Sequence, residues 1–418
     1  MQTFTSLFLT ALGVALAMQL WLALRQIQCV RRHRDIVPSA FAHRITIDSH
    51  RKAADYTIAR TRLEMVAVVY RGIVLLVWSL GRAIAFLDET WRALVPQPVL
   101  AGAGAIFSVL LLSALLELPL SLYRTFVIEQ RFGFNRTTAR VFAGDMVKEA
   151  LLSLALGLPL VFAILWLMGR DGSMLATYWW FFVWLSWLGF SLFVSWIYPV
   201  AIAPLFNRFT PLEIAELRAR IENLLSRTGF HSKGIFVVDG SRRSSHGNAY
   251  FTGFGRFKRI VFFDTLIEKL SGNEIEAVLA HELGHYARHH VRTHWIMTAL
   301  ISLAALCLLG WLDTQPWFFH GLGVTEPTPQ SALLLFLMCG PVFGYLLTPL
   351  LLDVSRRHEF EADRYAVRHT GGTNLCEALM KLYDDNASTL TPDPWYSRFH
   401  DSHPNAAVRI ATLQGAPP

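Results

Sequence analysis

Residues 98–122 read PVLAGAGAIFSVLLLSALLELPLSL, an apolar run in which Glu117 is the one charged residue. A helix rises about 1.5 Å per residue, so a run of this length crosses the hydrocarbon core of a bilayer, which is about 30 Å thick. The rest of the chain has the same character, because 53% of its 418 residues are hydrophobic and only 17% are charged. A soluble domain carries about 25% charged residues, so this composition excludes a soluble enzyme and a disordered chain.

Further apolar blocks on both sides of this run predict a polytopic membrane protein. The seven expected spans cover residues of about 4–24, 63–87, 98–122, 148–168, 177–205, 293–312 and 331–353. The second block contains Arg71 and Arg82, and the last is interrupted by Gly340, Pro341, Gly344 and Pro349. Charged side chains inside a span need a polar environment. We expect Arg71, Arg82 and Glu117 either to pair or reach an interface, or to line a water-filled cavity between helices.

The charges of the connecting loops predict the orientation of the chain. Loop 25–62 carries nine Lys and Arg residues, whereas loop 313–330 carries none, and the other loops alternate in the same way. Basic loops stay in the cytoplasm, so the N-terminus is expected outside and the C-terminus in the cytoplasm. The net charge of +7 is then a consequence of topology. Since no nucleic-acid recognition module is present, no nucleic-acid partner is expected.

The most informative motif for chemistry lies at residues 281–285, which read HELGH. His281 and His285 are four residues apart, so on a helix both imidazoles can reach one metal ion. Glu282 then lies beside a water on that metal and can accept its proton. Zinc suits two imidazole ligands with an open coordination position. The motif predicts a metal-dependent hydrolase.

A catalytic zinc ion needs a third protein ligand, and the neighbouring histidines do not supply it. Eight residues of helix cover about 12 Å, so His289 cannot share an ion with His281 while the helix stays straight. We interpret His289, His290 and His294 as surface residues near lipid headgroups.

The better candidate for the third ligand lies downstream, at residues 355–363. Glu359 can ligate the ion, while Asp363, one helical turn later, can accept a hydrogen bond from the far nitrogen of a ligand histidine. The alternative interpretation is a solvated charged helix after the last span. The expected topology argues against that alternative, because it places both motifs on the cytoplasmic side.

Two segments near the first motif have the composition of short strands. Residues 234–239 and 257–263 are rich in β-branched and aromatic side chains. An exposed strand edge would let a peptidase bind many sequences through main-chain hydrogen bonds.

With both motifs in place, the chain resembles the M48 metallopeptidases, and in particular the Ste24-type CAAX prenyl proteases. Further segments carry the resemblance over nearly the whole chain. They read FGFN at 132–135, FNRFTP at 206–211, NAYF at 248–251, FDTL at 263–266 and SHP at 402–404.

The resemblance implies an all-α polytopic membrane protein, with seven transmembrane helices around an intramembrane chamber and a cytoplasmic zinc-protease region containing a small β-sheet. It implies one Zn²⁺ per chain and a role for each of nine residues. His281, His285 and Glu359 would bind the zinc, and Glu282 would be the general base. His403 would stabilise the oxyanion, and Asp363 and Arg409 would organise the site. Asn248 and Ala249 would bind the substrate.

The expected function is that of an integral-membrane zinc metalloendopeptidase that acts on a peptide or protein substrate, prenylated or membrane-embedded. The membrane would be the plasma membrane in a bacterium or the endoplasmic reticulum in a eukaryote. Two alternatives stay open, a quality-control protease of the HtpX type and a non-catalytic seven-span transporter or receptor. The expected parts are a five-span region 1–205, a catalytic segment 206–292, two spans in 293–353 and a second catalytic segment 354–418.

Overall fold

The computed structural model describes residues 2–169, 174–252 and 258–414. Within these ranges, six helical stretches are long and apolar enough to cross a membrane, and a seventh results if two helices joined at a bend of 44° count as one span. The polytopic helical fold expected from the sequence is therefore confirmed, with six to seven spans. The six stretches comprise Thr3–Arg32, Pro98–Phe132, Ala139–Met168, Trp179–Phe206, His290–Leu312 and Pro329–Thr370.

Several of the six stretches consist of more than one helical segment. Helix α1 is Gln2–Arg32, α4 is Pro98–Tyr123, α6 is Ala139–Met168, α8 is Trp179–Ile197 and α13 is His290–Leu312. A wider helical turn follows α4 and another follows α8, and the short helices α5 (Gln130–Phe132) and α9 (Ala203–Phe206) then end the two stretches.

The second apolar block, 63–87, is divided between two helices that meet at a bend. Helix α2 (Ile47–Trp78) ends before the block does, and α3 (Ala83–Leu94) begins after a short turn. Arg82 occupies that turn with a left-handed φ of 62°. Its exposed guanidinium lies 3.7 Å from the Glu89 carboxylate, so Arg82 has a partner of opposite charge at the bend between the two helices.

The last span is broken between Gly344 and Pro349, whereas Gly340 and Pro341 lie within a continuous helix. Helix α15 (Pro329–Gly344) is followed by a 3₁₀ turn at Tyr345–Leu347 and by α16 (Thr348–Thr370). Pro349 lies in the first turn of α16, where a residue without an N–H is tolerated. Helix α16 then continues beyond the apolar residues, so one rigid element links the membrane region to the second motif.

A four-stranded sheet lies beside the helix that carries the first motif. Its order is β1 (Phe209–Pro211), β2 (Ile235–Val238), β4 (Arg259–Phe263) and β3 (Ala249–Thr252). Strands β2 and β4 are parallel and lie within the two predicted segments, although Phe257 falls outside the described residues. The other two pairs are antiparallel. Because β3 is last in the sheet order, it is an edge strand.

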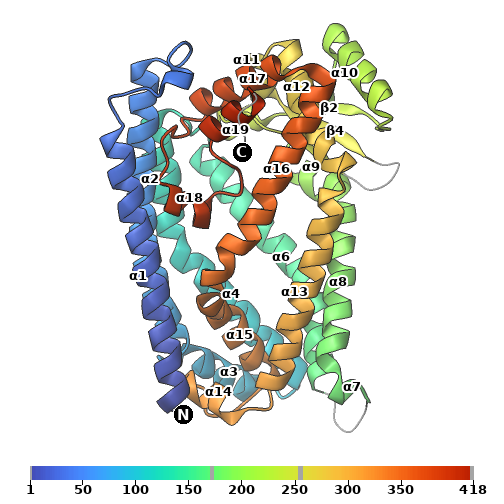
Figure 1. Cartoon of the computed structure of the whole chain (residues 1–418). Helices are drawn as coiled ribbons and strands as arrows, with labels where there is room; N and C mark the ends of the chain where they lie inside the picture. The colour runs from blue at the N-terminus through green and yellow to red at the C-terminus, as the bar shows by residue number, and fades with distance from the viewer. Residues whose placement is uncertain (1, 170–173, 253–257, 415–418) are drawn as a thin grey trace.

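The sheet, α10 (Ala215–Thr228), α11 (Asp264–Lys269) and α12 (Gly272–Ala287) share one hydrophobic core. Figure 1 shows this region at one end of the helical frame, together with α17 (Gly372–Asp385) and α19 (Ala406–Leu413). The N-terminus lies at the opposite end, near α3 and α14 (Pro316–Gly321). A second core packs α1, α3, α4, α14 and α15 there. The remaining helices are α7 (Met174–Thr177) and α18 (Pro394–His400).

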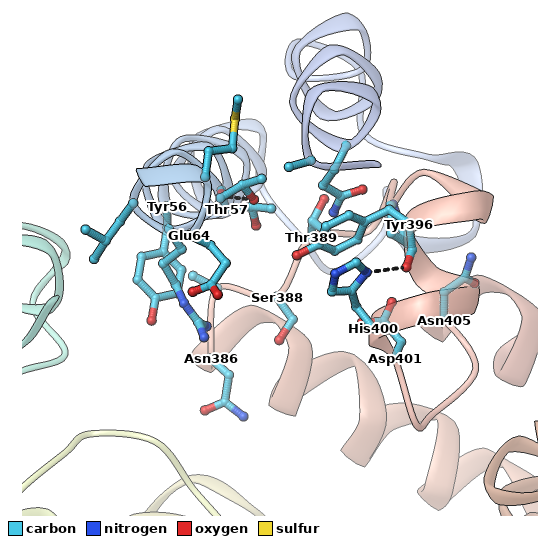
Figure 2. Close-up of a pocket in the computed structure, with 18 of the residues that line it drawn as sticks. Tyr56, Thr57, Glu64, Asn386, Ser388, Thr389, Tyr396, His400, Asp401 and Asn405 are labelled. Carbon is cyan, nitrogen blue, oxygen red and sulfur yellow. Dashed lines mark hydrogen bonds between the residues drawn. The ribbon is translucent and has the colours of Figure 1, made fainter. Parts of the chain in front are cut away.

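Two neighbouring open cavities lie within the helical frame. One of about 730 Å³ extends toward the C-terminal segments, and one of about 430 Å³ lies between α1, α2, α4 and α15. Gln19, Val68 and Tyr345 line both cavities, so the two cavities lie next to each other. Figure 2 shows polar side chains of α2 facing those of the C-terminal segment across the larger cavity.

Both alternatives for the charges within spans hold for one pair. Arg71 donates to the Glu117 carboxylate at 2.9 and 3.2 Å, and also to Glu64 at 2.9 Å. Arg71 and Glu117 together line the smaller cavity. The ion pair therefore supplies the polar environment that each charge needs, next to an open space inside the frame.

Candidate metal centre

Helix α12, which carries the first motif, starts at a reciprocal cap. The Ser271 N–H donates to the Glu274 carboxylate at 2.7 Å, and the Glu274 N–H donates to the Ser271 hydroxyl at 3.4 Å. Lys381 of α17 also donates to Glu274, at 2.6 Å. Such a cap satisfies two N–H groups that the helix itself leaves unpaired. The start of α12 is therefore fixed, and with it the face on which His281 and His285 lie.

Gly284, between the two histidines, lets α16 pack directly against α12. A Cβ atom at Gly284 would lie 2.8 Å from the Cα and 3.0 Å from the carbonyl oxygen of Ala362. Both are backbone atoms, which cannot move aside as a flexible side chain could. The close contact brings the face of α16 that carries Glu359 and Asp363 to the two histidines.

We expect Gly284→Ala to destabilise the protein by about 1–3 kcal/mol, because overpacking forces the two helices apart. Thermal unfolding of the purified protein measures the loss. The matched control is Gly144→Ala in α6, where an added Cβ meets no atom within 4 Å. The control should be neutral or stabilising, because alanine favours a helix. A Gly284→Ala protein that melts at the wild-type temperature would contradict the close packing of α12 against α16.

Three potential metal ligands converge between α12 and α16. The Nε2 atoms of His281 and His285 lie 3.2 Å apart, and Glu359 oxygens lie 3.5 Å and 3.3 Å from them. The ligand atoms of this set all lie within 4.8 Å of one another. One Glu359 oxygen, Oε2, is buried and has no hydrogen-bond partner among the described residues. Two imidazoles and a carboxylate that converge in this way fit a metal with an open coordination position.

The far nitrogen of His281 is held by a buried ion pair. His281 Nδ1 lies 2.8 Å from Asp363 Oδ1, as the helical spacing from Glu359 predicts. Arg409 of α19 donates to both Asp363 oxygens, at 2.9 and 2.6 Å. Burial by itself lowers the pKa of His281, but the hydrogen bonds to Asp363 and Glu359 outweigh it and raise this pKa to about 9. The carboxylates thus create a strong preference for positive charge at the centre.

Glu282 has the environment of a proton acceptor. Within the described part of the chain, no hydrogen bond or ion pair engages its carboxylate. Burial raises the pKa of Glu282 above its ordinary value. A free carboxylate with a raised pKa is better suited to accept and release a proton during a reaction.

His403 reaches the centre from the loop between α18 and α19. Its Nε2 lies 3.4 Å from Glu359 Oε1, and its Nδ1 lies 2.9 Å from the Ser402 hydroxyl. The His403 side chain is 61% exposed and lines the larger cavity. It therefore stands on the open side of the centre, where a bound molecule would lie.

The two predicted substrate-binding residues lie where β3 begins. The Asn248 carbonyl accepts a hydrogen bond from the Phe263 N–H at 2.9 Å, and Ala249 is the first residue of β3. Strand β3 pairs with β4 along one side, so its other side is the edge of the sheet. Helix α12 packs against β3, which brings this edge to the helix of the first motif.

The interpretation of His290 as a surface residue is wrong, whereas His289 and His294 are exposed as expected. His289 adopts a left-handed φ of 59°, so α12 ends and α13 begins in a new direction. His290 is buried and its Nδ1 lies 3.1 Å from His285 Nδ1. The surface interpretation requires a straight helix, and nothing in the sequence signals the break at His289.

A buried His–His–Glu cluster at one end of a bundle of membrane helices defines the class of membrane-embedded metallopeptidases. The comparisons with known proteins agree with this class. Residues 26–208 match the family model described as CAAX prenyl protease N-terminal, five membrane helices, and residues 211–416 match that of peptidase family M48.

Relatives cover most of the chain. The CAAX prenyl protease 1 homolog of Arabidopsis thaliana is 35% identical, with 97% of each chain covered. The CAAX prenyl protease 1 of Saccharomyces cerevisiae is 39% identical over 72% of this chain and 69% of its own. The crystal structure of S. mikatae Ste24p is 31% identical, covers 98% of each chain and superposes with a TM-score of 0.88. The chain belongs to peptidase family M48 and is a membrane metalloprotease of the Ste24 type.

Proposed function

We propose that the protein is a zinc-dependent endopeptidase that holds one zinc ion on His281, His285 and Glu359. The observation that carries the proposal is the convergence of these three side chains, whose ligand atoms all lie within 4.8 Å of one another. Glu359 Oε2 lies 3.4 Å from Arg409 but accepts no hydrogen bond among the described residues, so it can still bind a metal ion. An imidazole and carboxylate donor set also favours zinc over magnesium or calcium.

When bound, zinc supplies a Lewis acid that polarises the scissile carbonyl and lowers the pKa of water. Glu282 accepts the proton of the attacking water and then delivers it to the leaving amine. His403 donates a hydrogen bond to the oxyanion from the cavity side. Asp363 and Arg409 hold His281 in the tautomer whose Nε2 faces the centre.

The substrate main chain binds along the free edge of β3, beginning at Asn248 and Ala249. Support comes from the sheet order, because no described strand pairs with this edge, which lies beside α12. Main-chain hydrogen bonds of this kind accept many sequences. The cavity of about 730 Å³ beside His403 offers space for the rest of the substrate.

Cleavage takes place on the cytoplasmic side, with the N-terminus of the chain outside. Support comes from the basic loops, because loops 25–62 and 206–292 lie at the same end of the molecule as the site. The proposed membrane is the plasma membrane of a bacterium or the endoplasmic reticulum of a eukaryote. The catalytic parts are residues 206–292 and 354–418, joined by the two spans within 293–353.

For the substrate, we favour the carboxyl-terminal segment of a prenylated protein. Its support is the names of the relatives, CAAX prenyl protease 1 and its homologs. The second candidate is a membrane-embedded misfolded protein, as an HtpX-type quality-control protease would cleave. The six to seven spans of this chain favour the first candidate, since proteases of the HtpX type have fewer spans.

We expect the purified protein to cleave a prenylated carboxyl-terminal peptide at least about tenfold more efficiently, in kcat/KM, than the same peptide without the lipid. Burial of about two methylenes of the lipid already supplies a binding gain of this size, at about 0.8 kcal/mol per methylene. Mass spectrometry of the products gives the rate and the cleaved bond. An unfolded membrane protein serves as the competing substrate. Preferential cleavage of that substrate, with no gain from the lipid, would point to quality control instead.

A further inference from the structure

We propose that His290 and Glu361 are positioning residues for His285, which they hold through a hydrogen-bonded relay from its far nitrogen. This inference rests on the proposed function, because it assigns His285 to the metal. It concerns residues outside the metal-binding set and outside the motif HELGH. The relay runs from the imidazole of His285 to the imidazole of His290 and on to the carboxylate of Glu361.

The distances define the order of the relay. His285 presents Nε2 to the centre, 3.2 Å from His281 Nε2 and 3.3 Å from Glu359 Oε1. Its other nitrogen, Nδ1, lies 3.1 Å from His290 Nδ1. His290 Nε2 then lies 3.2 Å from Glu361 Oε2.

Only one arrangement of protons satisfies both contacts when His285 binds a metal through Nε2. The Nδ1 of His285 then carries the hydrogen, because a neutral imidazole bears it on the nitrogen that does not ligate. This N–H donates to His290 Nδ1, which must be an acceptor. The His290 hydrogen is consequently on Nε2, and it donates to the Glu361 carboxylate.

The two metal-binding histidines therefore differ in what holds them. His281 contacts the buried carboxylate of Asp363 directly, whereas His285 reaches a carboxylate through a second ring. The Glu361 side chain is 41% exposed, and the His290 side chain between them is only 7% exposed. The relay thus joins the buried centre to a charge at the surface.

Two features fix the His290 ring in this position. The left-handed conformation of His289 turns the chain, so that His290 approaches His285 although the two are five residues apart. On its other side, the His358 ring stacks on His290 with a centroid separation of 3.9 Å and an angle of 10°. A ring held on two sides is preorganised to hold its neighbour.

The test is the zinc affinity of the purified full-length protein, measured by competition with a chromophoric chelator. Partners of ligand histidines typically contribute 10–100-fold to metal affinity, so His290→Phe should weaken zinc binding by about that factor. His290→Asn keeps an acceptor near the position of Nδ1 and should restore most of the affinity. Glu361→Ala should weaken zinc binding about threefold or more, and Glu361→Gln, which keeps an acceptor, should stay within about twofold of wild type.

Two controls separate the relay from packing. His358→Phe preserves the stacked ring, and His294→Gln changes an exposed histidine of the same helix. Both should bind zinc as wild type does. The melting temperature of each zinc-free variant is measured alongside, because a purely structural role would lower it and leave zinc affinity unchanged.

The relay is wrong if His290→Phe and Glu361→Ala both bind zinc within about twofold of wild type. If His290→Phe does not fold, Glu361→Ala decides, since Glu361 is exposed enough to be replaced without opening the core. Failure of the proposed function is a different result, in which the wild-type protein itself binds no zinc.

Discussion

Glu282→Gln protein keeps its zinc and loses peptide cleavage. Glutamine has the shape of glutamate but cannot accept a proton from water, and a positioned general base contributes about 10²–10⁴-fold to a rate. We therefore expect kcat/KM for a prenylated peptide to fall by about that factor. Zinc retention is expected because Glu282 is not part of the His281, His285 and Glu359 set.

The comparison needs a control of the same chemistry. Glu268→Gln changes an exposed glutamate of α11 that lies outside the site, and it should cleave at the wild-type rate. Thermal unfolding of Glu282→Gln in the same detergent shows whether the fold is retained. A folded Glu282→Gln protein that cleaves at the wild-type rate would remove Glu282 from the mechanism.

Arg409→Met should destabilise the protein more than Gly284→Ala does. Arg409 is 5% exposed, donates two hydrogen bonds to Asp363 and lies 3.4 Å from Glu359 Oε2. Methionine fills a similar volume but leaves buried carboxylates without their cation. Breaking a buried ion pair on one side costs about 3–5 kcal/mol, so the zinc-free protein should unfold at a much lower temperature.

Added zinc should restore part of this lost stability, because a ligand that binds only the folded state stabilises it. The control is Arg218→Met, in an exposed pair with Glu222, which should leave the melting temperature unchanged. If the Arg409→Met protein had the same melting temperature as the wild type, Arg409 would not compensate the carboxylates of Asp363 and Glu359.

The sequence predicts what depends on local periodicity. Apolar runs identify the spans because a membrane helix must satisfy its backbone internally and present apolar side chains to lipid. The spacing of Glu359 and Asp363 places both on one face of α16, and Asp363 does reach the far nitrogen of His281. These relations hold within a single helix, so the helical repeat is sufficient to predict them.

The rest depends on turns and on contacts between distant segments. The turn before α3 and the break at His289 both use a left-handed residue other than glycine, which composition does not reveal. Arg409 and His403 reach the centre from a short helix and a loop that follow α16. Their positions follow from how α17 to α19 pack, so only the family resemblance pointed to them. The two cavities likewise depend on side-chain packing between helices.

The measurement that tests the central claim most directly is the zinc content of the purified wild-type protein, determined by elemental analysis beside Glu359→Ala. We expect about one zinc ion per wild-type chain and a content near zero for Glu359→Ala, because catalytic zinc sites need three protein ligands. A transporter or receptor in which HELGH is incidental would bind no metal. Wild-type protein with zinc near zero, after purification without chelators, would contradict the metal centre on which the proposed function rests.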